Sequence, residues 1–308
     1  MRATPMEEVL AARQRHPSHS VRRARALHDL IFWSSMGVLA AAGTLIVLLI
    51  AAFLLREGLP LIARDGLLRF LTDSGWWPRD GSFNMLPMML ASLLLTIGAL
   101  TLATPFSLAF AIHTTFRGPP AFVSALRALV EASAAVPTVV YGLWGVTTIV
   151  PLINMIAPPG ASLLAGIFVV ALMVFPTITI LVQAALQAVP AGHIQAASAL
   201  GVSQSQILLR IVLPAARHGI LSAMVLGAAR AIGETMVVLM VCGNIVQIPT
   251  SLFQPVRTLT ANIALEMPYA MGDHRASLFV VGLLTLLLVS GMVAVGEWVG
   301  ARGRVSSR

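Results

Sequence analysis

The sequence predicts an all-α, polytopic membrane protein with six transmembrane helices. Three observations support this fold class: 57% of the 308 residues are hydrophobic, only 10% are charged, and the apolar residues gather in long runs. An α-helix rises 1.5 Å per residue, so about 20 apolar residues cross the hydrocarbon core of a bilayer. Several runs reach that length, and we therefore expect the chain to cross a membrane repeatedly.

The runs divide the chain into five consecutive segments. Residues 1–29 are a basic tail, residues 30–55 the first transmembrane helix, and residues 56–84 an outer loop with aromatic residues at the membrane interface. Residues 85–300 hold the other five helices, and residues 301–308 are a second basic tail. We expect the five later helices at residues 85–112, 122–150, 163–188, 219–242 and 277–298.

Arginine is the basic residue of this chain, which contains no lysine. Six arginines lie in residues 1–29 and three in residues 301–308, and basic residues accumulate on the cytoplasmic side of a membrane. Both termini are therefore expected in the cytoplasm. Without lysine the chain cannot form the usual ATP-hydrolysing P-loop or a Schiff base.

The sequence gives no sign of a metal, a cofactor or a nucleic-acid partner. It has no paired cysteine or histidine pattern typical of a metal site. The single cysteine, Cys242, excludes an internal disulfide and is expected to pack between helices. We expect no catalytic residue in this chain.

Residues 193–214, between two expected spans, are predicted to form a structured loop of two short helices. The first helix ends at Gly201, because glycine enters the left-handed conformation without steric cost. The second begins at Ser203, where Gln206 completes a capping box, and ends at Pro214.

This loop resembles the EAA loop of the membrane subunits of ATP-binding-cassette (ABC) importers. In that family it forms the coupling helices that sit in a cleft of the ATPase subunit. The resemblance therefore implies a type I ABC importer permease fold, whereas the alternative is an ordinary amphipathic hairpin at a membrane surface. The matching residues are Ala196, Ala197, Gly201, Ile211, Leu213 and Pro214, with Gln195 in the place of the loop's glutamate.

Two pairs of opposite charges lie four residues apart in expected spans. Arg230 and Glu234 fall near the middle of the fifth span, and Arg127 and Glu131 lie nearer the inner end of the third. Residues four apart share a helix face, and a charge at membrane depth costs at least ~2.5–3.5 kcal/mol unless it faces the bundle or water. Each pair is either a structural ion pair or part of a substrate site, since a guanidinium suits phosphate or carboxylate oxygens.

A row of small residues on the fifth span predicts close helix packing. Gly219, Ala223, Gly227 and Ala231 follow one another at intervals of four residues and so share one face. Small side chains at this spacing let a second helix approach closely.

Three further stretches, residues 131–145, 229–244 and 247–267, are similar to the PstC family of phosphate-specific permeases. The resemblance implies inorganic phosphate as the substrate and Arg230 with Glu234 as the functional pair. We expect Thr235, Arg257 and Thr258 to supply further donors. The implied partners are a second, PstA-like permease, two PstB-like ATPases that hold ATP and Mg²⁺, and a periplasmic PstS-like binding protein at a bacterial inner membrane.

Other functions stay open at this point. A permease for another oxyanion, such as sulfate or molybdate, would share the same features. An ATP-independent secondary transporter would explain the membrane charges but not the EAA-type loop. An ion channel would need a span ringed by charges of one sign, and a sensor in phosphate signalling would lack the contact with an ATPase.

Overall fold

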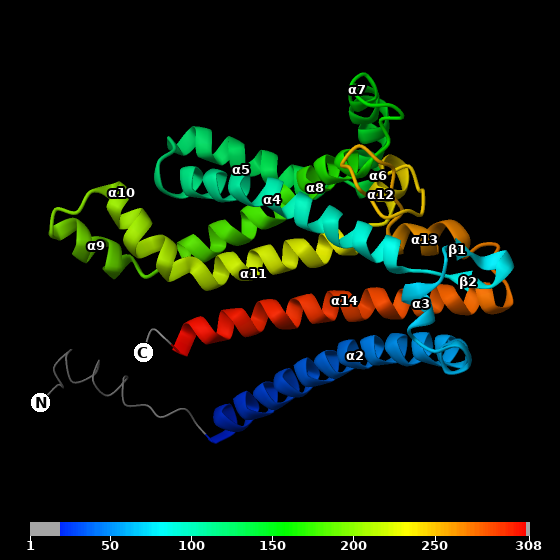
Figure 1. The fold of residues 1–308 in the computed structure, drawn as a ribbon. Coiled ribbons are helices and arrows are strands. Elements are labelled where there is room, and N and C mark those ends of the chain that lie inside the picture. Colours follow the sequence, from blue (N-terminus) through cyan, green and yellow to red (C-terminus); the bar gives the residue numbers. More distant parts are fainter. Residues whose placement is uncertain (1–18, 306–308) are drawn as a thin grey trace, which may run out of the picture. The chain divides into compact units, whose positions relative to one another are not determined.

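The computed structural model describes the backbone of residues 19–305. It describes the side-chain environments of residue 29 and of residues 32–300. Helices make up most of this part of the chain, and the strands in it form one short hairpin (Figure 1). The chain divides into two units, residues 1–53 and residues 54–308. Most of the predicted N-terminal tail and the last three residues of the C-terminal tail lie outside the described residues.

The first expected span lies within α2 (His19–Asp65), a helix of 47 residues. Its apolar part, Phe32–Asp65, is long enough to cross a membrane. Side chains of residues 32–50 are exposed around the whole helix, as lipid contact requires. The helix also extends ten residues into the expected outer loop of residues 56–84 and continues through Pro60.

The rest of the outer segment is compact. It consists of α3 (Arg69–Thr72), β1 (Trp76–Trp77), the short helix η1 (Pro78–Asp80) and β2 (Ser82–Phe83), and β1 pairs antiparallel with β2. Because side chains alternate across a strand, Trp76 is buried and Trp77 is exposed. Of the aromatic residues expected at the membrane interface in this loop, Trp76 lies inside the protein instead.

Three helices build the main core of the unit formed by residues 54–308. In this core α8 (Leu163–Gln187) packs against α4 (Leu86–Phe116) and α11 (Leu213–Ile232). The predicted row of small residues is confirmed as a packing face, since Ala223, Gly227 and Ala231 are buried. A Cβ atom at Gly227 would lie 2.7 Å from the Ile178 side chain of α8.

The third expected span is not one straight helix. It divides into α5 (Pro120–Ala134) and a second arm made of α6 (Thr138–Trp144), η2 (Gly145–Ile149) and α7 (Val150–Asn154), and the two arms meet at 94°. Pro137 causes the break, because proline lacks the backbone donor and disfavours helical geometry in the residue before it. Five helices of the described chain are long and apolar enough to span a membrane, or six if this bent pair counts as one span.

The fifth expected span is also interrupted. Its helix α11 ends at Ile232, and α12 (Met236–Val241) begins after a break at residues 233–235. An outer segment with α13 (Leu259–Glu266) follows, and α14 (Gly272–Val305) covers the last expected span. The predicted C-terminal tail therefore begins inside a helix.

Replacing Gly227 by leucine should separate α8 from α11. The added side chain would meet Ile178 in a packed core, where overpacking costs about 1–3 kcal/mol. We expect a lower midpoint of thermal unfolding in detergent. Gly291→Leu on α14 is the matched control, since nothing lies within 4 Å of a Cβ there; equal effects of both changes would contradict the packing argument.

Candidate functional site

Arg230 lies in the last turn of α11, beside the helix break, and is partly buried. Its Nη1 atom donates a hydrogen bond to Thr177 Oγ1 on α8 at 3.2 Å. Among the described residues no ion pair joins it to Glu234. The prediction that these two side chains share one helix face is wrong, because the helix ends between them.

Glu234 lies in the break and stabilises the helix that follows. Its carboxylate accepts a hydrogen bond from the Val237 backbone N–H at 3.2 Å, and its backbone carbonyl accepts one from the Thr260 hydroxyl at 2.7 Å. The side chain is only 9% exposed. Its neighbour Thr235 is partly buried, and the Thr235 hydroxyl donates to the Gly233 carbonyl at 3.3 Å. Glu234 therefore fixes the start of α12 and does not neutralise Arg230 by direct contact.

Arg257 is held by a buried acid. Its Nη1 atom lies 2.6 Å from Glu266 Oε1 and 3.0 Å from Asn262 Oδ1, while Nε donates to the Asn244 carbonyl at 2.9 Å. Thr258, the next residue, is 3% exposed and accepts from the Ala261 N–H at the start of α13. Both predicted donors are thus engaged within the protein.

Glu266 is a functional candidate that sequence reasoning missed. It is 7% exposed, and its Oε2 atom lies 2.8 Å from Trp76 Nε1 and 2.8 Å from His274 Nε2. With Arg257 on its other oxygen, this carboxylate joins β1, α14 and the outer segment. Its sequence signal was an acid at the end of an apolar stretch, IALEM, within the expected outer segment.

The second charge pair lies on α5. Arg127 is partly buried, and its Nη2 atom donates to the Thr114 carbonyl of α4 at 3.1 Å, while its Nε atom is buried without a partner in the described structure. Glu131 is exposed. The two residues share a helix, as predicted, but the described residues show no ion pair between them.

The predicted loop of two helices is present. The first is α9 (Ala191–Ala199), which ends before Gly201 at φ +74°, and Ser203 Oγ accepts from the Gln206 N–H at the start of α10 (Gln204–Ile207). The predicted end at Pro214 is wrong. A π-helical turn, η3 (Leu208–Val212), joins α10 directly to α11. The wider turn accommodates Pro214, which has no backbone N–H to donate, and the helix continues through it.

The loop presents one exposed face and one buried face. Gln195, Ala196 and Pro214 are exposed, as is Leu200, at 83%. The opposite face packs against the core through a second set of side chains, which are Ala197, Ile207, Ile211, Val212 and Leu213. A hydrogen bond of 3.0 Å from Arg117 to Ser205 Oγ ties α10 to the end of α4.

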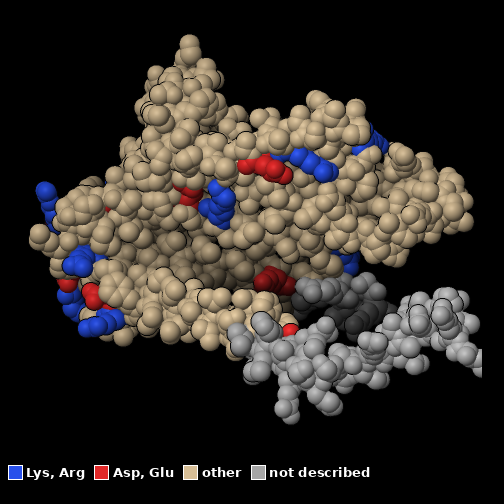
Figure 2. Space-filling view, turned by 180° about the vertical axis from the view of Figure 1, so that it is seen from behind, with Lys and Arg blue, Asp and Glu red and all other residues tan. Residues whose placement is uncertain are grey.

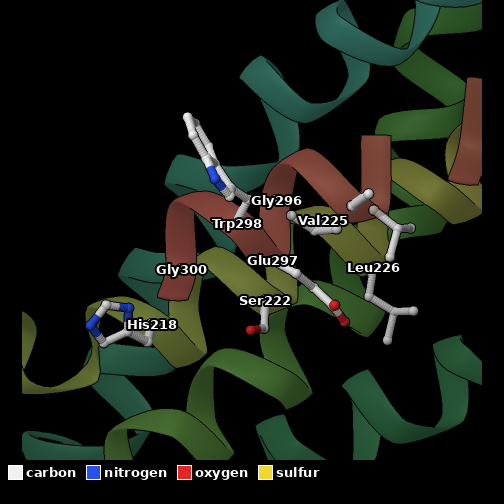
Figure 3. A pocket seen from close by; sticks show the side chains of 10 residues that line it. His218, Ser222, Val225, Leu226, Gly296, Glu297, Trp298 and Gly300 are labelled. Atoms are coloured by element: carbon white, nitrogen blue, oxygen red, sulfur yellow. The ribbon is translucent and has the colours of Figure 1, made fainter. Parts of the chain in front are cut away.

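A cavity of about 730 Å³ lies between α11 and α14. Figure 3 shows Glu297 extending from α14 across α11, with His218 and Ser222 on the facing helix. The two helices approach closely where Gly296 meets Val225. The sequence prediction included none of these residues.

Comparison with known proteins identifies the family. A model described as "Binding-protein-dependent transport system inner membrane component" matches residues 103–305. The chain belongs to this family. It is accordingly a multi-pass inner-membrane transport component.

Two relatives align with most of this inner-membrane component. The phosphate transport system permease protein PstC of Mesorhizobium japonicum is 31% identical over 95% of this chain and 96% of its own length. The probable ABC transporter permease protein YqgH of Bacillus subtilis is 33% identical over 83% of this chain and 85% of its own.

The fold is that of ABC transporter permeases, as predicted. A chain of a bacterial alginate ABC transporter superposes with a TM-score of 0.59 and 13% identity, covering 92% of this chain and 96% of that one. This likeness supports the type I importer fold.

Removing the Glu266 carboxylate should destabilise the packing of β1, α13 and the start of α14. Glu266→Ala leaves the Arg257 guanidinium unpaired, and breaking a buried ion pair from one side costs about 3–5 kcal/mol. We expect a clearly lower midpoint of thermal unfolding. Glu131→Ala removes an exposed carboxylate and should change that midpoint little; a similar drop in both variants would refute the role given to Glu266.

Proposed function

We propose that this chain is a PstC-type membrane subunit of an ATP-driven importer, which carries inorganic phosphate across the inner membrane by alternating access. The observation that carries this proposal is the 31% identity over 95% of the chain to a phosphate transport permease. Two structural features support the proposal: Arg230 lies beside a helix break, and the chain has an EAA-type loop.

The helix break supports a substrate path at this point of the chain. Irregular backbone at membrane depth is tolerated where it is buried in protein or lines a water-filled cavity. Residues 233–235 separate α11 from α12, whereas the sequence predicts one uninterrupted span here. Arg230 lies at the edge of this interruption, where a substrate passing the break would meet it.

Arg230 is the side chain best suited to receive phosphate. One of its five N–H donors is directed at Thr177, and Glu234 is turned toward α12. The guanidinium charge is therefore available to an anion, and its planar fork matches phosphate oxygens. Thr177 keeps the guanidinium in place when the site is empty.

The other predicted residues contribute less directly. Glu266 offsets the charge of Arg257. Arg257 and Thr258 therefore support the outer segment and contact phosphate only at the edge of that segment. Thr235 lies in the break itself. Arg127, whose buried Nε has no partner in the described structure, marks a second position on the path with Glu131 beside it.

The loop of α9 and α10 is the contact with the ATPase. Its exposed face, with Gln195, Ala196 and the protruding Leu200, fits the cleft of an ATPase subunit, while its buried face holds it against the core. ATP and Mg²⁺ bind to two PstB-like ATPases, since this chain has no lysine for a P-loop. Both termini and this loop face the cytoplasm.

Two further partners complete the importer. A PstA-like permease supplies the other half of the membrane path. A periplasmic PstS-like protein delivers phosphate, in keeping with the binding-protein dependence in the description of the family.

Arg230→Ala should strongly reduce phosphate transport. Proteoliposomes with the whole importer should lose at least about tenfold of their ATP-dependent uptake of radiolabelled phosphate, because the path loses a charge-assisted contact worth about 1.5–3 kcal/mol. Assembly and ATPase activity should persist. Arg56→Ala, which removes an exposed arginine of α2 outside the proposed path and the ATPase contact, is the control and should transport normally.

The same assay tests the substrate. Excess arsenate should compete with phosphate, whereas sulfate should not. Transport that survives Arg230→Ala would make Arg230 a structural residue, and uptake of sulfate in place of phosphate would overturn the substrate assignment.

A change at Gly201 should weaken coupling to the ATPase. Alanine at φ +74° costs about 1–2 kcal/mol and would tilt α9 against α10. We expect less ATPase to copurify and less stimulation of its activity by the loaded binding protein. Gly192→Ala is the matched control on α9, where nothing lies within 4 Å of a Cβ; equal losses would show that the left-handed turn is not required.

A further inference from the structure

The cavity of about 730 Å³ between α11 and α14 changes in polarity along its length. His218 and Ser222 lie on the part of α11 nearest the coupling loop, and Glu297 reaches across from α14. The stretch further along is apolar, with a lining that includes Val225, Leu226 and Val293. Figure 3 shows Ser222 and Glu297 directed into one space, with His218 on one side of it and Leu226 on the other. A ligand that fits this cavity therefore has one polar and one apolar end.

Glu297 lies at the level of the lipid headgroups. Helix α14 covers about 36 Å from Asp273 to Glu297 at 1.5 Å per residue, which exceeds the ~30 Å of a hydrocarbon core. Asp273 marks an aqueous end, because it pairs with Arg64 at 2.7 Å while both side chains are exposed. Trp298, next to Glu297, is 55% exposed, and tryptophan is enriched where membrane meets water. The cavity thus runs from the headgroups into the hydrocarbon layer.

The surface beside the cavity suits contact with lipid. Val295 and Val299, which flank the lining residues of α14, are 62% and 48% exposed. Figure 2 shows few charged side chains over the middle of the helical bundle, whereas charged side chains gather at one end. Charges are rare where a membrane protein faces lipid chains. An amphiphile from the bilayer can therefore enter the cavity from the side.

The Glu297 carboxylate needs a cation from outside the chain. No hydrogen bond or ion pair within residues 32–300 engages it. Beside apolar side chains, a carboxylate stays ionised only where a cation or hydrogen-bond donors replace its lost hydration. The lining of the cavity contains no arginine, and the chain contains no lysine. The occupant therefore supplies the positive charge.

Basic side chains at the polar end of the cavity attract a negative group as well. Arg217 is exposed on α11, and its Nε atom donates to His218 Nε2 at 3.3 Å. A guanidinium suits phosphate oxygens. The polar end of the occupant thus carries a phosphate near Arg217 and an ammonium at Glu297, and the two groups occur together in an ethanolamine headgroup.

We infer that this cavity binds a phospholipid of the phosphatidylethanolamine class, and that Glu297 accepts hydrogen bonds from its primary ammonium. A primary ammonium has three N–H donors, whereas the quaternary ammonium of a choline lipid has none and a glycerol headgroup carries no positive charge. The site goes beyond phosphate transport, because the inference needs only that the chain is a membrane component.

Photo-cross-linking in the complete importer tests this site. Nanodiscs would hold the importer with a phosphatidylethanolamine whose acyl chain carries a benzophenone, and labelled peptides would be identified by mass spectrometry. The label should fall on residues 218–226 and 293–300. Excess unlabelled phosphatidylethanolamine should reduce this capture at least about tenfold, whereas excess phosphatidylcholine or phosphatidylglycerol should not.

Glu297→Gln should lower the capture at least about tenfold, because the charge-assisted hydrogen bonds to the ammonium are lost. Asp29→Asn is the matched control, since it removes an exposed acid at the start of the first apolar segment. That variant should capture the lipid normally. Size-exclusion chromatography would establish that both variants assemble.

A second pair of variants tests the cavity itself and does not depend on Glu297. Ala294→Trp places a large side chain in the lining and should abolish capture. Val295→Trp places the same side chain on the neighbouring residue, which is exposed and outside the lining, and should leave capture unchanged.

Three results would contradict the inference. Equal competition by the three lipids would overturn the ethanolamine headgroup, and capture that survives both Glu297→Gln and Ala294→Trp would overturn the site. Label on another subunit, with none on residues 218–226 and 293–300, would show that a protein helix fills the cavity in place of lipid. None of these results bears on phosphate uptake, which the Arg230→Ala assay tests separately.

Discussion

The close approach of α8 to its neighbours is the constraint on which the other contacts depend. A Cβ atom at Gly98 or at Gly227 would lie within 3 Å of an isoleucine of α8, so each glycine sets the distance between two helices. At this distance Thr177 of α8 reaches Arg230, and Gln183 reaches Thr114 beside Arg127. The polar groups of the proposed path are therefore positioned by apolar packing.

The number and approximate position of the spans follow from the sequence, because length and apolar composition decide which segments can cross a membrane. The interruptions do not follow from hydropathy. The hydropathy of an apolar segment is the same whether its helix is straight, bent by 94° at Pro137 or broken at Gly233. Proline marks the first break, whereas at the second the Glu234 carbonyl accepts a hydrogen bond from Thr260 of α13, which is a tertiary contact.

Local chemistry made the coupling loop predictable, whereas distant contacts hid the rest of the site. The positive φ of Gly201 and the cap at Ser203 depend on residues within a few positions. The pairing of Arg230 with Glu234 was inferred from an unbroken helix and failed with that assumption. Glu266 was missed because Trp76, one of its partners, lies 190 residues away along the chain.

The π-helical turn η3 connects the coupling loop to the proposed substrate path. Because it carries the helix past Pro214 without a gap, residues Gln204–Ile232 form one continuous helical segment of 29 residues. This continuous helix joins the exposed loop directly to Arg230. A movement of α10 is therefore passed to the guanidinium through helical backbone alone, with no loop between the two.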